Sequence, residues 1–156
     1  MQKDQTKDAN AVWFLNGRLT FRRSAAEGPD RVCVTEQSMA QGDSPPLHRH
    51  RREDEVFHVL EGVMRFRVGE TEVVAQAGET LLAPKGVPHT FRIESSRAHF
   101  LTISVGGDFE AMVREMSRPA GEDLPPMMTP TEALKAALTE ACARHQIDIV
   151  GPPLAA

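Results

Sequence analysis

The segment from Gly42 to Gly62 reads GDSPPLHRHRREDEVFHVLEG, and its polar residues follow a regular spacing. His48 and His50 are two residues apart, so both imidazoles would project from the same face of a strand. Glu55 follows a short charged stretch and can return to that face after a bend. Gly42 and Gly62 fall at predicted turns, where a positive φ is often required. The segment therefore predicts a strand, a bend and a second strand that bring two imidazoles and one carboxylate together.

A second spaced pattern follows downstream and consists of Gly78, Pro84, Gly86 and His89. His89 would come from a neighbouring strand and add a third imidazole to the same pocket. Neutral imidazoles with one carboxylate suit a divalent first-row transition metal and leave positions for water or substrate. With a 2+ ion this set would carry about +1 net charge, which favours an anionic ligand on the metal. The alternative is a polar pocket that holds no metal.

The segment from Ala11 to Val105 alternates between strand and turn signals. Met64 to Val68 places its apolar residues on one face and two arginines on the other. His89 to Ile93 and Arg97 to Val105 alternate in the same way, and Asn16-Gly17 favours a tight hairpin turn. Several short strands with turns marked by glycine and proline are typical of an antiparallel sandwich or barrel.

Several apolar side chains share the parity that should point into this barrel. They include Phe57, Met64, Phe66 and Phe91. In one interpretation they are simply barrel core. In the other they line an apolar substrate pocket beside the imidazoles, which is compatible with a flat aromatic ligand.

Beyond Gly106-Gly107 the spacing of apolar residues becomes helical. Asp108 can cap a first helix, whose apolar residues recur at intervals of three and four. Thr129-Pro130-Thr131-Glu132 has the spacing of a capping box ahead of a second helix from Ala133 to Arg144. The chain then returns to extended structure at Ile147–Leu154.

The length of 156 residues is close to that of one domain. We expect a flexible N-terminal tail at residues 1–10, a β-barrel at 11–106, and a helical C-terminal extension at 107–156 that packs on the barrel. The net charge is −4, so we expect no nucleic acid and no anionic membrane surface as partners. No apolar run approaches the ~20 residues of a membrane helix, and the polar start does not read as a secretory signal. Cys33 and Cys142 read as reduced thiols, so we expect a cytoplasmic protein.

The two spaced patterns resemble the two conserved motifs of the cupin superfamily. The first matches at every fixed letter, and the second matches through His89 but carries Ile93 where the family pattern has Asn, which is not a metal ligand. Further stretches resemble single-domain bacterial cupins of the quercetin dioxygenase group. These are Val12–Leu15, Pro45–His48, Arg52–Phe57, Gly106–Glu110 and Gly151–Pro153.

This resemblance implies an all-β cupin double-stranded β-helix, or jelly-roll barrel, with two short C-terminal helices. It also implies one divalent transition metal per chain, bound by His48, His50, Glu55 and His89. The identity of the metal among iron, nickel, cobalt, manganese, copper and zinc stays open, because affinity order and cellular supply decide it together.

The implied function is a metal-dependent dioxygenase of the quercetinase type. In flavonol dioxygenases of this group, the substrate hydroxylate binds the metal and the glutamate ligand takes its proton. Glu55 would then be both a ligand and the general base. Dioxygen cleaves the heterocycle of a flavonol-like or other enolisable aromatic substrate, and carbon monoxide is released.

Two alternatives stay open. One is another metal-dependent oxygenase or an isomerase built on the same ligands, and the other is a non-catalytic cupin that binds or senses a small molecule. The resemblance also implies a homodimer, in which the Val12–Phe14 segment would be exchanged between copies. A strand that closes the edge of its own barrel is equally consistent with that segment.

Overall fold

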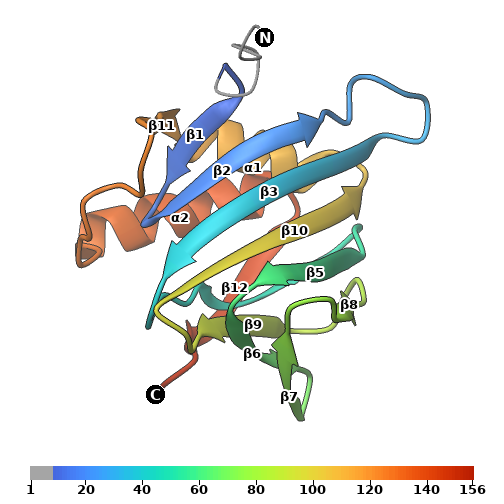
Figure 1. Ribbon diagram of the computed structural model, residues 1–156. Helices are drawn as coiled ribbons and strands as arrows, with labels where there is room; N and C mark the ends of the chain where they lie inside the picture. The colour runs from blue at the N-terminus through green and yellow to red at the C-terminus, as the bar shows by residue number, and fades with distance from the viewer. Residues whose placement is uncertain (1–8) are drawn as a thin grey trace, which may run out of the picture.

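The structure is a computed structural model that describes residues 9–156, so most of the expected N-terminal tail lies outside the described residues. Two antiparallel sheets face each other (Figure 1). The larger sheet has the strand order β11-β1-β2-β3-β10-β5-β8, and the smaller one has the order β12-β4-β9-β6-β7. The predicted all-β double-sheet fold with two helices is confirmed.

The bounds of the elements follow the predicted alternation closely. The larger sheet contains β1 (Ala11–Phe14), β2 (Gly17–Arg23), β3 (Val32–Ala40), β5 (Glu55–Glu61), β8 (Thr80–Ala83), β10 (Arg97–Val105) and β11 (Arg118–Pro119). The smaller sheet contains β4 (Pro46–His50), β6 (Val63–Val68), β7 (Thr71–Gln76), β9 (His89–Ile93) and β12 (Ile147–Pro153). The helices are α1 (Asp108–Met116) and α2 (Glu132–Arg144).

Strand β10 shows why these segments form a sheet with one buried face. Ala98, Phe100, Thr102 and Ser104 are buried, and the residues between them are not. This period of two matches the geometry of a strand whose side chains alternate between core and solvent. Strand β10 pairs with β3 on one side and β5 on the other, so it is an interior strand of the larger sheet.

The turns need glycine at the predicted positions, because Gly42, Gly62, Gly78 and Gly86 all have a positive φ. Gly62, between β5 and β6, shows a second reason, since a Cβ there would lie 2.4 Å from the carbonyl oxygen of Arg97. The β1–β2 hairpin is confirmed, but its turn differs from the expected Asn16-Gly17.

The β1–β2 turn lies one residue earlier than Asn16-Gly17. Phe14 pairs with Gly17, which leaves Leu15 and Asn16 as the turn, and Leu15 has the positive φ of 53°. Asn16 has a further role, because its side-chain amide donates to the carbonyl of Met128 and accepts from the backbone N–H of Met128, both at 3.0 Å. Asn16 therefore connects the hairpin to the chain that precedes α2.

Both helices begin differently from the expectation. The residue before α1 is Gly107, so Asp108 is the first helical residue and not its cap. The residue that caps α2 is Thr131, whose side chain accepts a hydrogen bond from the backbone N–H of Leu134. Glu132 is therefore the first residue of α2 and lies too near the cap to close the expected box.

The helices lie behind β1, β2 and β3 in Figure 1, against the inner side of the larger sheet. The C-terminal extension is not only helical, because β12 pairs with β4 and β11 pairs with β1. Neither helix of the described chain is long and apolar enough to cross a membrane.

The interior contains two groups of buried side chains. We call the first the barrel core; it lies between the sheets and includes Phe57, Val59, Met64, Phe66, Phe91, Ile93 and Phe100. We call the second the helix-side core; it lies between the larger sheet, the helices and β12, and includes Leu19, Phe21, Cys33, Met112, Val113, Leu138, Cys142 and Ile147.

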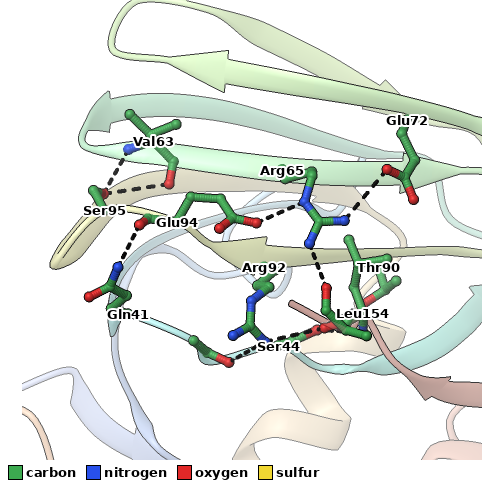
Figure 2. Close-up of polar contacts among 12 residues, drawn as sticks. Gln41, Ser44, Val63, Arg65, Glu72, Thr90, Arg92, Glu94, Ser95 and Leu154 are labelled. Carbon is green, nitrogen blue, oxygen red and sulfur yellow. Dashed lines mark hydrogen bonds and ion pairs between the residues drawn. The ribbon is translucent and has the colours of Figure 1, made fainter.

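The loop before β4 is fixed by polar contacts that Figure 2 shows. The hydroxyl of Ser44 accepts from the backbone N–H of Leu154 at 2.9 Å, and Thr90 donates to the carbonyl of Pro45 at 2.7 Å. Arg92 donates to the carbonyl of Leu154 and Arg65 donates to that of Ala155. These contacts hold the C-terminal residues and the loop in one place, directly before the strand that carries His48.

Candidate metal centre and its cavity

The four residues predicted to bind metal come together between the two sheets. His48 and His50 lie on β4, and His89 lies on the adjacent β9, where it pairs directly with His48. Glu55 is the first residue of β5 in the opposite sheet. One ligand atom from each of the four residues lies within 4.8 Å of the others.

The carboxylate of Glu55 forms the centre of the cluster. Its Oε2 atom lies 2.8 Å from Nε2 of His89 and 3.1 Å from Nε2 of His50. The ring centroids of His48 and His89 are 4.5 Å apart. Nδ1 of His48 is 2.7 Å from the carbonyl oxygen of Pro46 and can donate a proton only there, which leaves Nε2 of His48 as its free lone pair.

The electrostatics of the cluster favour the metal-binding forms of His48 and Glu55, but not that of His50. Burial, together with His89 and His50, lowers the pKa of His48 to about 3, so His48 is neutral. Burial alone would raise the pKa of Glu55, but His50 and His89 outweigh it and hold that pKa well below its usual value. For His50, burial is outweighed by Glu55 and Glu53, which raise the pKa. Metal binding at this cluster therefore requires His50 to give up its proton.

The donor set fits a divalent transition metal. Both ring nitrogens of His50 are buried, and apart from the ion-pair contact of Nε2 with Glu55 at 3.1 Å, neither nitrogen forms a well-aligned hydrogen bond with a described residue. An imidazole buried in this way is costly unless one nitrogen binds a cation or a donor. With His48, Glu55 and His89 beside it, His50 is consistent with the metal site typical of cupins.

A cavity opens from this cluster toward the helices. Its empty volume is about 860 Å³, counting the space at its mouth. His48, His50 and Glu55 lie in its wall, and most of the remaining wall is apolar. The polar residues away from the cluster are Gln37, Asp43, Ser44 and Thr102, and no lysine or arginine among residues 9–156 lines the cavity.

The expected pocket residues divide into two pairs. Phe57 and Phe91 line the cavity, whereas Met64 and Phe66 are fully buried in the barrel core and do not reach it. The strand order explains the division, because β6 lies on the side of β9 away from β4, so Phe66 and Met64 are one strand further from β4 than Phe91 is. The ring of Phe66 also lies behind those of Phe57 and Phe91, with centroids 5.2 and 5.7 Å away.

The helices and β12 supply the part of the cavity wall that the sequence did not indicate. These residues are Phe109, Met112, Leu138, Cys142, Ile147 and Ile149. Periodicity assigned the helical ones to an apolar face but could not show what that face covers. Both cysteines are buried, and burial raises the pKa of Cys33 to about 12 and that of Cys142 to about 11, which disfavours a nucleophilic thiolate.

Glu53 is a further buried residue beside the cluster. It stands in a charged run that reads as a solvated loop, yet it is only 1% exposed. Its Oε1 accepts a hydrogen bond of 2.9 Å from the backbone N–H of Phe109 in the first turn of α1. Gly107, the residue before α1, has no side chain that could cap the helix. Glu53, in the loop between His50 and Glu55, therefore provides the capping acceptor.

The other histidines lie outside the cluster. Nδ1 of His58 is 2.8 Å from the hydroxyl of Thr80, on the outer face of the larger sheet. Nε2 of His99 is 2.6 Å from Glu36, and Nε2 of His145 is 2.6 Å from Glu115.

Comparison with known proteins agrees with this architecture. Residues 35–105 match the family described as Cupin domain, so this part of the chain is similar to cupin domains. Quercetin 2,3-dioxygenase of Bacillus subtilis (strain 168) is 25% identical over 109 residues, which are 70% of this chain and 30% of that protein. The chain thus spans less than a third of the length of this relative.

Two solved structures show the same fold at low identity. A predicted oxalate decarboxylase from Thermotoga maritima has a TM-score of 0.58 at 16% identity, covering 64% of this chain and 95% of that one. A sugar phosphate isomerase of the cupin superfamily from Silicibacter pomeroyi has a TM-score of 0.52 at 21% identity, covering 58% and 60%. Proteins of this fold therefore carry several different activities, so the function of this chain has to be inferred from its cavity and not from its fold.

Proposed function

We propose that this protein is a metal-dependent dioxygenase that cleaves a flavonol-like or other enolisable aromatic substrate with O2. The observation that carries the proposal is the position of the His48, His50, Glu55 and His89 cluster in the wall of an apolar cavity. The bacterial relative named above is itself a quercetin 2,3-dioxygenase.

In this proposal the four residues of the cluster hold one divalent transition metal, which supplies a Lewis-acid and redox centre when bound. Glu55 accepts the proton of the substrate hydroxyl, because its carboxyl group is held in the anionic form and lies at the cavity wall. Phe57 and Phe91 pack against the substrate rings and exclude water from the reacting end.

The cavity favours this substrate class over a sugar phosphate. A phosphate group is bound most strongly by cationic side chains, and none of the described lysines and arginines lines the cavity. Its apolar wall instead offers a flat, apolar molecule a large area to bury. An isomerase acting on a phosphorylated sugar is therefore a poorer match to this cavity than an oxygenase acting on an aromatic compound.

Oxygen consumption by reconstituted protein tests the proposal. Iron, nickel, cobalt, manganese and copper forms are each mixed with quercetin in an oxygen electrode, with the zinc form and Glu55→Gln as controls. We expect at least one form to consume O2 in step with loss of flavonol and release of carbon monoxide. Thermal stabilisation by flavonol with no O2 uptake in any form would overturn the dioxygenase and favour a non-catalytic binding or sensing cupin.

We also propose that the protein is a homodimer. Strand β1 pairs with β2 and β11 of its own chain, so we do not propose that it is exchanged between copies. We propose instead that the dimer contact is formed by exposed aliphatic residues on the outer face of the larger sheet. Val32, Leu82 and Val105 there are 42%, 53% and 51% exposed. Light scattering at micromolar concentration should give a dimer that Leu82→Lys weakens, and a monomeric native protein would contradict the proposal.

A further inference from the structure

Gln37 presents a polar group in the apolar part of the cavity wall. It lies on the inner face of β3, and its Nε2 donates to the hydroxyl oxygens of Thr102 at 2.9 Å and of Thr35 at 3.3 Å. Around it the cavity is lined by apolar side chains such as Leu19 and Met39. The side chain is thus fixed at its nitrogen end within a wall that offers few other polar atoms.

The two threonines determine which end of the Gln37 amide faces them. Thr35 donates its one hydroxyl proton to the carbonyl oxygen of Thr102. The Thr35 oxygen can therefore only accept from Gln37, which requires the amide nitrogen on that side. The amide oxygen is directed away from the threonines, and because Gln37 lines the cavity this oxygen is the acceptor that it can offer to a ligand.

The register places Gln37 far from the metal cluster along the same inner face. Glu55 pairs with Ser104 on β10, and the next inward position pairs Phe57 with Thr102. Gln37 pairs with Phe100, one inward position further along β10, and it lies on the far side of that strand from β5. A ligand that spans the cluster and Gln37 must cover two inter-strand spacings, roughly 10 Å, and two inward positions along the strands, roughly 13 Å, less the reach of the side chains, which suits an elongated molecule of several linked rings.

We propose that Gln37 determines substrate specificity by accepting a hydrogen bond from a hydroxyl group at the end of the aromatic substrate remote from the metal-binding group. The proposal rests on the proposed function for the metal-bound end of the substrate. Gln37 would thereby select polyhydroxylated aromatic compounds over analogues that carry only the metal-binding hydroxyl. The selection arises because an analogue without the remote hydroxyl would bury the amide oxygen with no partner.

Anaerobic titration of the zinc-loaded protein with two flavonols tests this. Quercetin carries hydroxyls on its remote rings, and 3-hydroxyflavone has the same metal-binding group without them. From the absorbance change on binding, we expect the native protein to prefer quercetin by about tenfold, the usual effect of one unmade buried hydrogen bond. Gln37→Met keeps the size and removes the acceptor, so its preference should fall close to one.

The control is Ser38→Ala on the outer face of the same strand, which should retain the native preference and the native melting temperature. Equal affinity of the native protein for both flavonols, a preference that persists in Gln37→Met, or binding of neither flavonol would overturn the proposal. Adding O2 to the protein loaded with a redox-active metal separates the role of Gln37 in binding from the proposed dioxygenase activity. A Gln37-dependent preference without O2 uptake would uphold the role of Gln37 and reject the dioxygenase.

Discussion

The two cores of this molecule differ in how completely they are filled. In the barrel core the aromatic rings pack against one another, with centroids of Phe57 and Phe66 5.2 Å apart and those of Phe91 and Phe100 5.4 Å apart, and of its buried members Phe57 and Phe91 line the cavity. In the helix-side core, Leu19, Met112, Leu138, Cys142 and Ile147 are buried and yet line the cavity. One core fixes the barrel that carries the metal ligands, and the other leaves space for a ligand.

The largest expected effect comes from the filled core. Phe100 is 0% exposed and does not line the cavity, so Phe100→Ala should reduce the free energy of unfolding by about 3–5 kcal/mol. Urea unfolding followed by circular dichroism measures this change. A loss below about 1.5 kcal/mol would mean that the barrel core is loosely packed, and the two cores would then not differ in how completely they are filled.

A smaller effect is expected in the helix-side core. Leu138→Ala on α2 should cost about 2 kcal/mol, the lower end of the range for leucine, because its side chain already borders free space. It should alter the affinity for quercetin and leave the metal content unchanged. If it instead lowered the metal content while quercetin affinity stayed constant, α2 would support the cluster and not the cavity.

Glu53 connects the two regions and should have an intermediate effect. Glu53→Ala removes the acceptor for the Phe109 N–H and should cost about 1 kcal/mol, as for the loss of a helix cap. Its matched control is Glu110→Ala, another buried glutamate, whose carboxylate accepts from Ser24 and the backbone of Ala25 away from the cluster. Both variants should lose stability, and only Glu53→Ala should change flavonol affinity, because Phe109 lines the cavity.

The smallest effect concerns the surface contact that joins β12 to β4. Asp148 forms ion pairs with Arg49 and Arg51, and the Arg51 hydrogen bond is the main cause that lowers the pKa of Asp148 to about 2. A lowered carboxyl pKa stabilises the folded state above the ordinary value of about 3.9 and ceases to do so as the pH falls toward 2. Because the arginines are half exposed, Asp148→Asn should cost less than about 1 kcal/mol at pH 7.

Urea unfolding of both proteins at a series of pH values measures the difference. It should shrink as the pH falls from about 4 toward 2, because the carboxylate of the unfolded chain takes up a proton in this range while that of the folded protein stays ionised until the pH nears 2. A difference that stays constant down to the lowest pH at which both proteins fold would show that the carboxylate charge of Asp148 does not contribute.

The cluster itself could be predicted because its information is local. His48 and His50 must share one strand face, and the two spaced patterns placed Glu55 and His89 beside them. The barrel strands followed from their period of two for the same reason. The alternation also assigned four apolar residues to the interior of the barrel, but it could not show which of them border the cavity. For this reason Met64 and Phe66 were grouped with Phe57 and Phe91.

What could not be predicted depends on contacts between distant segments. Glu53 looks like part of a solvated charged run, and its partner Phe109 lies 56 residues further along. Gln37 lies on the same inner face of β3 as Cys33 and Thr35. The orientation of its amide, however, depends on a hydrogen bond to Thr102 of another strand, which the sequence does not indicate. Gly17 next to the turn is closely packed, since a Cβ there would lie 3.2 Å from Cγ of Met39 on another strand.

The most direct test of the account is the metal content of the purified, untagged protein by elemental mass spectrometry. His48→Ala removes one residue of the cluster, and His58→Ala removes a histidine of the outer sheet face as the matched control. The account predicts near-stoichiometric transition metal in the native protein and in His58→Ala, and none in His48→Ala. Equal metal in all three proteins, or none in the native protein after reconstitution, would contradict a metal centre at this cluster.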